Sequence, residues 1–135
     1  MKYNYVCKIL LMIFGIIAII TGAMSMFAGA SDPTYSLTTP FNQILDMNLR
    51  FLSAIWLGVG LGCLFAVKQV GKDNFTIILL SLLILAGGLG RADNFARFGG
   101  VPNIPYLFIT ISEFVGPALI IWTAINAKKQ KLASS

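Results

Sequence analysis

The sequence predicts an all-α membrane protein built as a bundle of four transmembrane helices, and three observations lead to this fold class. The 135 residues are 57% hydrophobic and only 11% charged, whereas soluble domains carry about 25% charged residues. Four long apolar runs follow one another along the chain. Lysines and arginines gather between these runs and fall into two separate groups. Most of the surface must therefore face lipid.

The four apolar runs define the expected spans. A helix needs about 20 apolar residues to cross about 30 Å of hydrocarbon. The second and third runs are shorter, but flanking arginines can lengthen them because long side chains reach back to the interface. We expect one membrane domain, residues 1–135, with spans at about 8–28, 50–68, 74–92 and 104–127.

A signal peptide is the alternative for the first run. Lys2 and Lys8 give a basic start, and Ala28-Gly29-Ala30 has the pattern of small residues found at cleavage sites. However, the apolar stretch is longer than the about 7–15 residues usual in such a segment. A membrane span is therefore the preferred interpretation.

The basic residues predict that both chain ends face the cytoplasm, because cytoplasmic loops carry an excess of Lys and Arg. With the N-terminus inside, the inner segments hold seven lysines and the outer segments hold three arginines. The inner group is Lys2, Lys8, Lys68, Lys72, Lys128, Lys129 and Lys131, and the outer group is Arg50, Arg91 and Arg97.

The first outer loop ends in a segment of mixed character. Apolar residues alternate with polar ones from Phe41 to Leu49, and this spacing suits a short amphipathic helix at the outer interface. The same pattern fits the polar start of the second span. The sequence alone does not separate these alternatives.

The composition argues against several functions. The chain has no His and only two cysteines, Cys7 and Cys63, so it lacks the commonest general base and the Ser–His and Cys–His nucleophile pairs. No nucleotide-binding loop and no basic stripe with interleaved aromatics is present. We therefore expect no catalytic residue, metal, cofactor or nucleic-acid partner. The cysteines are expected to pack without a disulfide, because both fall towards the cytoplasmic side.

Small residues mark the expected packing faces. Glycines lie in each of the first three spans, and in lipid such positions let helices approach closely. These faces allow a homodimer or a membrane-protein partner but do not require one. The glycines concerned are Gly15, Gly22, Gly58, Gly60, Gly62, Gly87, Gly88 and Gly90.

Glu113 is the charge that most needs explaining, because it lies inside the fourth apolar run. An ionisable group at such depth costs at least about 2.5–3.5 kcal/mol and normally faces a partner in the protein interior. At about 1.5 Å per helical residue, Glu113 lies about 21 Å above the cytoplasmic end of its span, Arg50 about 27 Å and Arg91 about 25 Å. The carboxylate is therefore expected to pair with Arg91, Arg50 or both.

Two interpretations remain open for the charged residues Glu113, Arg50 and Arg91, which share one depth in the membrane. They form either a structural ion pair that sets helix register, or a binding site for an anionic amphiphile such as a membrane lipid, because intramembrane charges usually mark functional sites. In the second case the ligand-binding residues are Asn48, Arg50, Arg91, Asn94 and Glu113.

The motifs at this level carry a family resemblance. Asn48-Leu49-Arg50-Phe51, Gly88-Leu89-Gly90-Arg91 and Glu113 resemble the bacterial family called domain of unknown function 4345 and the wider DoxX-like group of small four-helix membrane proteins. The resemblance spans nearly the whole chain. It implies four helices in a bacterial inner membrane, a site at Asn48, Arg50, Arg91 and Glu113, and no particular activity.

Three further functions compete with amphiphile binding. A small proton-coupled transporter would use Glu113 as the proton carrier. An accessory or structural membrane subunit would need no ligand. An enzyme acting on a lipid would depend on Glu113 or Asp93 alone for acid–base chemistry, which makes it the weakest of the three.

Overall fold

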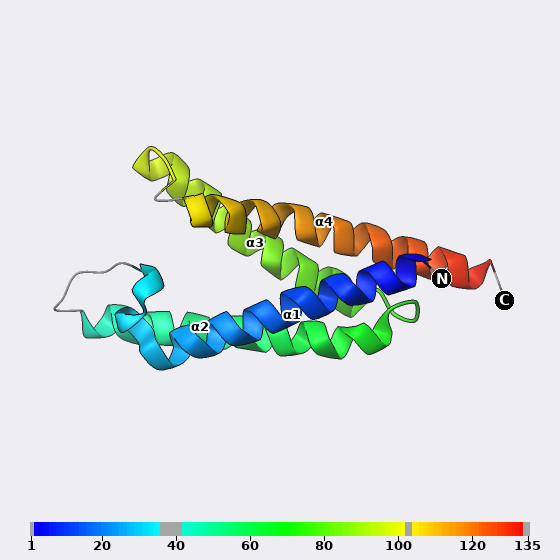
Figure 1. Ribbon diagram of the computed structural model, residues 1–135, viewed down its shortest axis with the longest axis horizontal. Helices are drawn as coiled ribbons and strands as arrows, with labels where there is room; N and C mark the ends of the chain where they lie inside the picture. The colour runs from blue at the N-terminus through cyan, green and yellow to red at the C-terminus, as the bar shows by residue number, and fades with distance from the viewer. Residues whose placement is uncertain (1, 36–41, 102–103, 134–135) are drawn as a thin grey trace. The chain divides into compact units, whose positions relative to one another are not determined.

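The computed structural model describes residues 2–35, 42–101 and 104–133, and within them the chain is helical with no strand (Figure 1). The long helices are α1 (Lys2–Ala28), α2 (Gln43–Ala66), α3 (Phe75–Phe98) and α4 (Ile104–Leu132), and the short 3-10 turns are η1 (Gly29–Ser31), η2 (Pro33–Tyr35) and η3 (Val67–Gln69). All four long helices are long and apolar enough to cross a membrane. The predicted all-α fold class with four spans is confirmed.

The helices leave most of their apolar side chains uncovered. Between 22% and 28% of the residues in the most apolar window of each span are buried. Large aliphatic side chains such as Ile20 and Leu82 are about half exposed. Apolar surface of this extent is unfavourable in water, so it supports a lipid environment.

The helix α2 includes the segment for which the sequence left two alternatives. It begins at Gln43 and continues without a break to Ala66. Asn42 is its N-cap residue, because the side-chain Oδ1 accepts hydrogen bonds from the backbone N–H groups of Ile44, at 2.8 Å, and Leu45, at 3.4 Å. Residues 43–49 are therefore the polar start of α2 and not a separate helix, whereas Phe41 lies outside the described residues.

The chain divides into two compact units. One is Met12–Phe65, which holds most of α1 and nearly all of α2. The other combines Met1–Leu11 with Ala66–Ser135, and so joins the beginning of α1 to α3 and α4. We call them the α1–α2 unit and the α3–α4 unit.

In the α1–α2 unit, two helix backbones meet at glycines. A Cβ atom at Gly60 would lie 2.8 Å from the carbonyl oxygen of Gly15 and 2.8 Å from the amide nitrogen of Ile19. A Cβ atom at Gly22 would lie 2.6 Å from the amide nitrogen of Leu57. Backbone atoms cannot rotate out of the way as side chains can, so these contacts require glycine. The sequence predicted close helix packing at such small residues.

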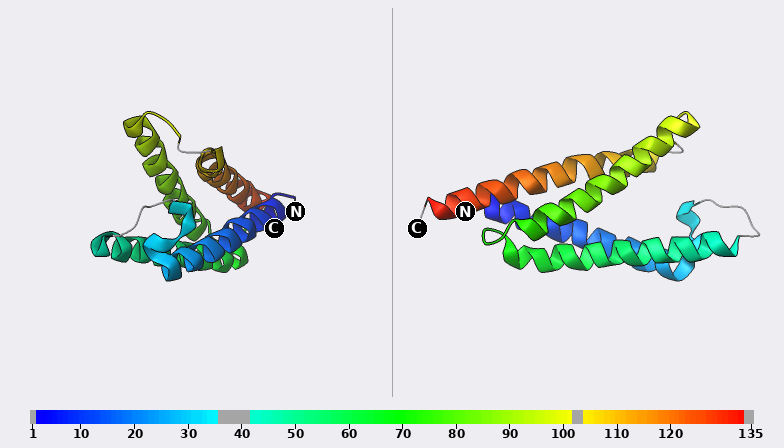
Figure 2. Two further views of the ribbon diagram at one scale, coloured as in Figure 1. Left: turned by 60° about the vertical axis from the view of Figure 1, so that its left-hand side comes forward. Right: turned by 180° about the vertical axis from the view of Figure 1, so that it is seen from behind.

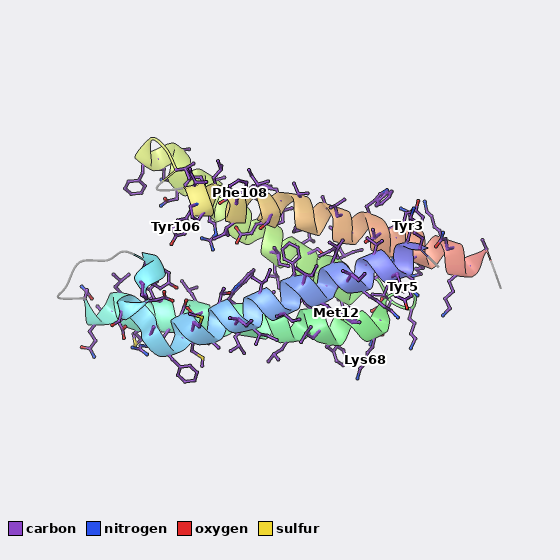
Figure 3. The ribbon with its side chains drawn as sticks, viewed as in Figure 1. Tyr3, Tyr5, Met12, Lys68, Tyr106 and Phe108 are labelled. Atoms are coloured by element: carbon purple, nitrogen blue, oxygen red, sulfur yellow. The ribbon has the colours of Figure 1, made fainter. Side chains whose placement is uncertain are left out.

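In the α3–α4 unit, α3 and α4 lie side by side (Figure 2), and the beginning of α1 contacts α4. The Cys7 thiol lies 3.8 Å from the carbonyl oxygen of Ile120, to which it donates. The ring of Tyr3, labelled in Figure 3, meets Trp122 edge to face with 5.2 Å between centroids. Cys7 here and Cys63 in the α1–α2 unit are both free and buried.

We expect Gly60→Ala to lower the free energy of unfolding by about 1–3 kcal/mol, because the added methyl group forces apart two backbones. Gly58→Ala is the matched control on the same helix, since a Cβ atom there would meet nothing within 4 Å. The control should be neutral, or stabilising by up to about 1 kcal/mol through helix propensity. Thermal unfolding in one detergent measures both variants, and equal midpoints would contradict the packing described.

Candidate functional site

The helices α3 and α4 bring Arg91 and Glu113 together. The Arg91 Nε–H donates to both carboxylate oxygens of Glu113, at 3.0 Å to Oε2 and 3.2 Å to Oε1. Gly88, one turn earlier on α3, allows this approach, because a Cβ atom there would lie only 3.0 Å from the Cβ of Glu113. Of the partners that the sequence offered for Glu113, the structure therefore uses Arg91.

The two side chains of this pair differ in exposure. Glu113 is 6% exposed, whereas Arg91 is 41% exposed. A carboxylate placed inside an apolar helix is tolerated when it has a partner, and Arg91 supplies one. The arginine side of the pair faces outward, so a further group can approach the guanidinium.

The guanidinium of Arg91 has donors to spare. Arginine carries five N–H groups, and within the described residues Arg91 uses only Nε for hydrogen bonding. Its Cζ atom lies 5.9 Å from the ring centroid of Tyr106, which Figure 3 labels near the beginning of α4. The Nη1 and Nη2 groups are thus open to a ligand beside an aromatic ring, which supports a cation through its face.

Pro117 changes the backbone at Glu113. In an α-helix each N–H donates to the carbonyl four residues earlier, and Pro117, inside α4, has no N–H. The carbonyl of Glu113 therefore receives no bond from the helix ladder. One residue thus offers a buried carboxylate and a backbone acceptor that is free of the ladder.

Arg50 has a different environment, entirely within the α1–α2 unit. Its Nε–H donates to Asp46 at 2.8 Å. Its Nη groups donate to the last three carbonyls of α1, those of Met26 at 3.2 Å, Phe27 at 2.6 Å and Ala28 at 3.4 Å. Such carbonyls have no partner inside a helix, so Arg50 closes the C-terminal end of α1. The ligand-binding role of Arg50 stays a prediction, and this geometry gives Arg50 a structural one.

The turn after α1 is attached to the same group. The Ala30 N–H donates to Asp46 Oδ1 at 2.8 Å. Gly29 has a φ of +58°, and a Cβ there would overlap the Asp46 carboxylate and Arg50, so only glycine suits that position. Ser25 donates to the buried Asp32 at 2.5 Å. Sequence reasoning did not assign Asp46 to Arg50, although their spacing of four residues indicates a helical pair.

The remaining predicted site residues lie at exposed positions. Asn48 is on α2 in the α1–α2 unit, and Asn94 is on α3 three residues after Arg91. Residues three apart adjoin on a helix surface, so Asn94 is a neighbour of Arg91 on α3. Asn94 also lines an open pocket with Phe98, Gly99, Gly100 and Val101. Arg97 donates to Asp93 at 2.6 Å, and these two residues lie four apart on α3.

No metal site accompanies this arrangement among the residues that the structure describes, because no three His, Cys, Asp or Glu side chains come together there. The arrangement can donate N–H groups from Arg91 to an anionic or acceptor group and can accept a hydrogen bond at the Glu113 carbonyl.

Four apolar helices of membrane-spanning length, two of them joined by the ion pair of Arg91 and Glu113, fit a multi-pass membrane protein. The chain belongs to the family described as domain of unknown function (DUF4345), whose family model matches residues 6–124. No curated protein and no solved structure matches the chain. The expected membership of this one family is confirmed.

We expect Arg50→Gln to lower the free energy of unfolding by about 1–3 kcal/mol, because several charge-assisted hydrogen bonds to the end of α1 are lost. Arg97→Gln removes the same charge from an Arg–Asp pair of the same spacing whose arginine side chain is 72% exposed, and should change stability by less than about 1 kcal/mol. Thermal unfolding in detergent compares the two. A larger loss for Arg97→Gln would contradict the structural role of Arg50.

Proposed function

We propose that this protein binds the head group of an anionic amphiphile at Arg91. The observation that carries the proposal is the set of unused Nη groups on a half-exposed arginine inside a membrane helix. Arg50 offers a direct contrast, because its four hydrogen bonds hold protein groups. Arg91 is therefore the arginine whose donors fit a ligand.

The chemistry of Arg91 suits a carboxylate or phosphate. The Nη edge of a guanidinium offers parallel N–H groups that match two oxygens of one anion. Glu113 already balances the charge of Arg91, so a free ion gains little Coulomb energy there. An amphiphile adds apolar contact, and exposed side chains on α3 and α4 supply it, among them Leu89, Leu107 and Phe108. This favours an amphiphile over a small soluble anion.

A bacterial inner membrane with both chain ends in the cytoplasm is part of the same proposal, supported by the seven inner lysines and three outer arginines. Exposed Lys129 and Phe98 lie at opposite sides of this topology. In intact cells we expect a membrane-impermeant maleimide to label Phe98→Cys and to leave Lys129→Cys unlabelled until lysis. The reverse pattern would contradict the orientation, and buried Cys7 and Cys63 keep the background low.

A proton-coupled transporter is the second candidate, and the burial of the Glu113 carboxylate is the observation in its favour. Against it, both oxygens accept from Arg91, so a proton carrier would first have to lose that contact. Proton flux into liposomes that disappears in Glu113→Gln would support transport over binding. A subunit without any ligand is the third candidate, and the ligand test below separates it.

The test of binding compares Arg91→Gln with Arg97→Gln by native mass spectrometry of the purified full chain. Both changes remove one α3 arginine that pairs through Nε with a carboxylate, that of Glu113 on α4 for Arg91 and that of Asp93 on α3 for Arg97. We expect a discrete bound mass in the wild type and in Arg97→Gln. Arg91→Gln should lose about tenfold or more of its occupancy, because one charge-assisted bidentate contact contributes at least about 1.5 kcal/mol.

The outcomes of this experiment separate the proposals. Equal occupancy in both variants would place the ligand elsewhere and overturn the role of Arg91. A clean apo mass in all three proteins would favour a structural ion pair and a function that depends on a protein partner. Thermal midpoints recorded beside the spectra show whether each variant is folded.

A further inference from the structure

A pocket opens in the α3–α4 unit at the end where α1 begins and α4 ends. Its volume is about 380 Å³, and four lysines line it. Lys8 comes from α1, Lys68 from η3, Lys72 from the turn before α3, and Lys131 from α4. Figure 3 labels Lys68 at this end of the molecule. The fold thus gathers four cations from three separate parts of the sequence into one lysine pocket.

Three of the four lysines, Lys8, Lys68 and Lys72, have little charge compensation from the described residues. These three lysines form no ion pair with any described residue. Asp73 follows Lys72, but its Oδ1 accepts the backbone N–H of Phe75 at 3.0 Å and it does not line the pocket. Like charges around one cavity repel each other, so a bound anion relieves an unfavourable arrangement.

Asn4 supplies a second and independent observation. It lines the pocket, and its Oδ1 atom is buried without a hydrogen-bond partner among the described residues. That atom lies 4.0 Å from the Cβ position of Gly71, which has a φ of +78° and turns the chain tightly beside it. The oxygen and nitrogen of an amide are assigned from the surrounding hydrogen bonds, so Asn4 can present either an acceptor or two donors. A buried polar group without a partner indicates a ligand or a water at that point.

We propose that the lysine pocket binds a phosphate group, with a phospholipid head group as its carrier. Ammonium groups bind phosphate as point charges, and basic pockets between membrane helices bind anionic head groups. Exposed apolar side chains on α1 and α3 lie near the lining residues in sequence, among them Tyr5, Val6, Ile9 and Phe75, and they offer contact to acyl chains. The inference does not rest on the site at Arg91.

The test uses the full chain in mixed micelles with dansyl-labelled phosphatidylglycerol as the probe, followed by energy transfer from tryptophan. Measurement at about 0.5 M salt, where the Debye length is about 4 Å, suppresses diffuse attraction between exposed charges. The pocket variant replaces Lys8, Lys68 and Lys72 by Gln. The matched control replaces Lys2, Lys128 and Lys129 by Gln, which removes the same charge from lysines that do not line the pocket.

We expect the pocket variant to raise the apparent Kd on the order of tenfold or more and the control to stay within about twofold. Asn4→Asp, which keeps the shape and adds a negative charge, should also weaken binding about fivefold. Equal losses in the pocket variant and the control, or full binding in the pocket variant, would overturn the proposal. The single variant Asn4→Asp tests the proposal even if the triple variant does not fold. Unchanged binding in a folded Asn4→Asp variant would also overturn the proposal.

Two further arms identify the carrier of the phosphate. Unlabelled phosphatidylglycerol should displace the probe, whereas phosphatidylcholine should not, because its phosphate is balanced by choline. Inorganic phosphate at about 10 mM should leave the probe bound, since a free ion lacks the acyl contacts. Displacement by inorganic phosphate with no dependence on lipid would overturn the phospholipid as carrier and assign the pocket to the free ion.

Discussion

Helices surrounded by hydrocarbon are not driven together by the hydrophobic effect, because lipid tails are as apolar as their side chains. Attraction must come from close packing and from polar contacts, and both appear here at the same places. Gly60 lets α1 and α2 backbones meet. Gly88 lets α4 approach α3 closely enough for Arg91 to reach Glu113. The close packing and the ion pair depend on each other, since the carboxylate is tolerated at that depth only with its partner.

The fold class was predictable because its signal is long and redundant. Each helix corresponds to a long run of apolar residues. A helix can place such a run in a bilayer because all its backbone hydrogen bonds are made within the segment. The boundaries were less certain, because polar residues continue a helix beyond the hydrocarbon. Gln43 belongs to α2 because the Asn42 side chain caps the helix there. The same sequence pattern also suits a separate helix at the membrane interface, so the pattern alone did not predict where α2 begins.

The candidate site was predictable only in part, and the reason is geometric. Counting residues along a helix gives depth, and depth correctly brought Arg91 and Glu113 into reach. Depth does not tell which neighbouring helix a side chain faces. It therefore placed Arg50 at the depth of Glu113 but did not reveal that Arg50 binds Asp46 and the carbonyls at the end of α1. A spacing of four residues favours a helical ion pair both for Asp93 with Arg97 and for Asp46 with Arg50. The carbonyls bound by Arg50 depend on how the chain turns after α1, which no pattern in the sequence encodes.

The attachment of the turn after α1 has a consequence for how accessible this part of the chain is to a peptidase. The segment Ala28-Gly29-Ala30 has the composition of a processing site, yet Gly29 and Ala30 are buried in η1. Arg50 holds the Ala28 carbonyl and Asp46 holds the Ala30 N–H. Susceptibility to a peptidase follows the burial and hydrogen bonding of the backbone. The folded structure therefore protects this segment from a peptidase, and any cleavage there would have to take place before α2 packs against the end of α1.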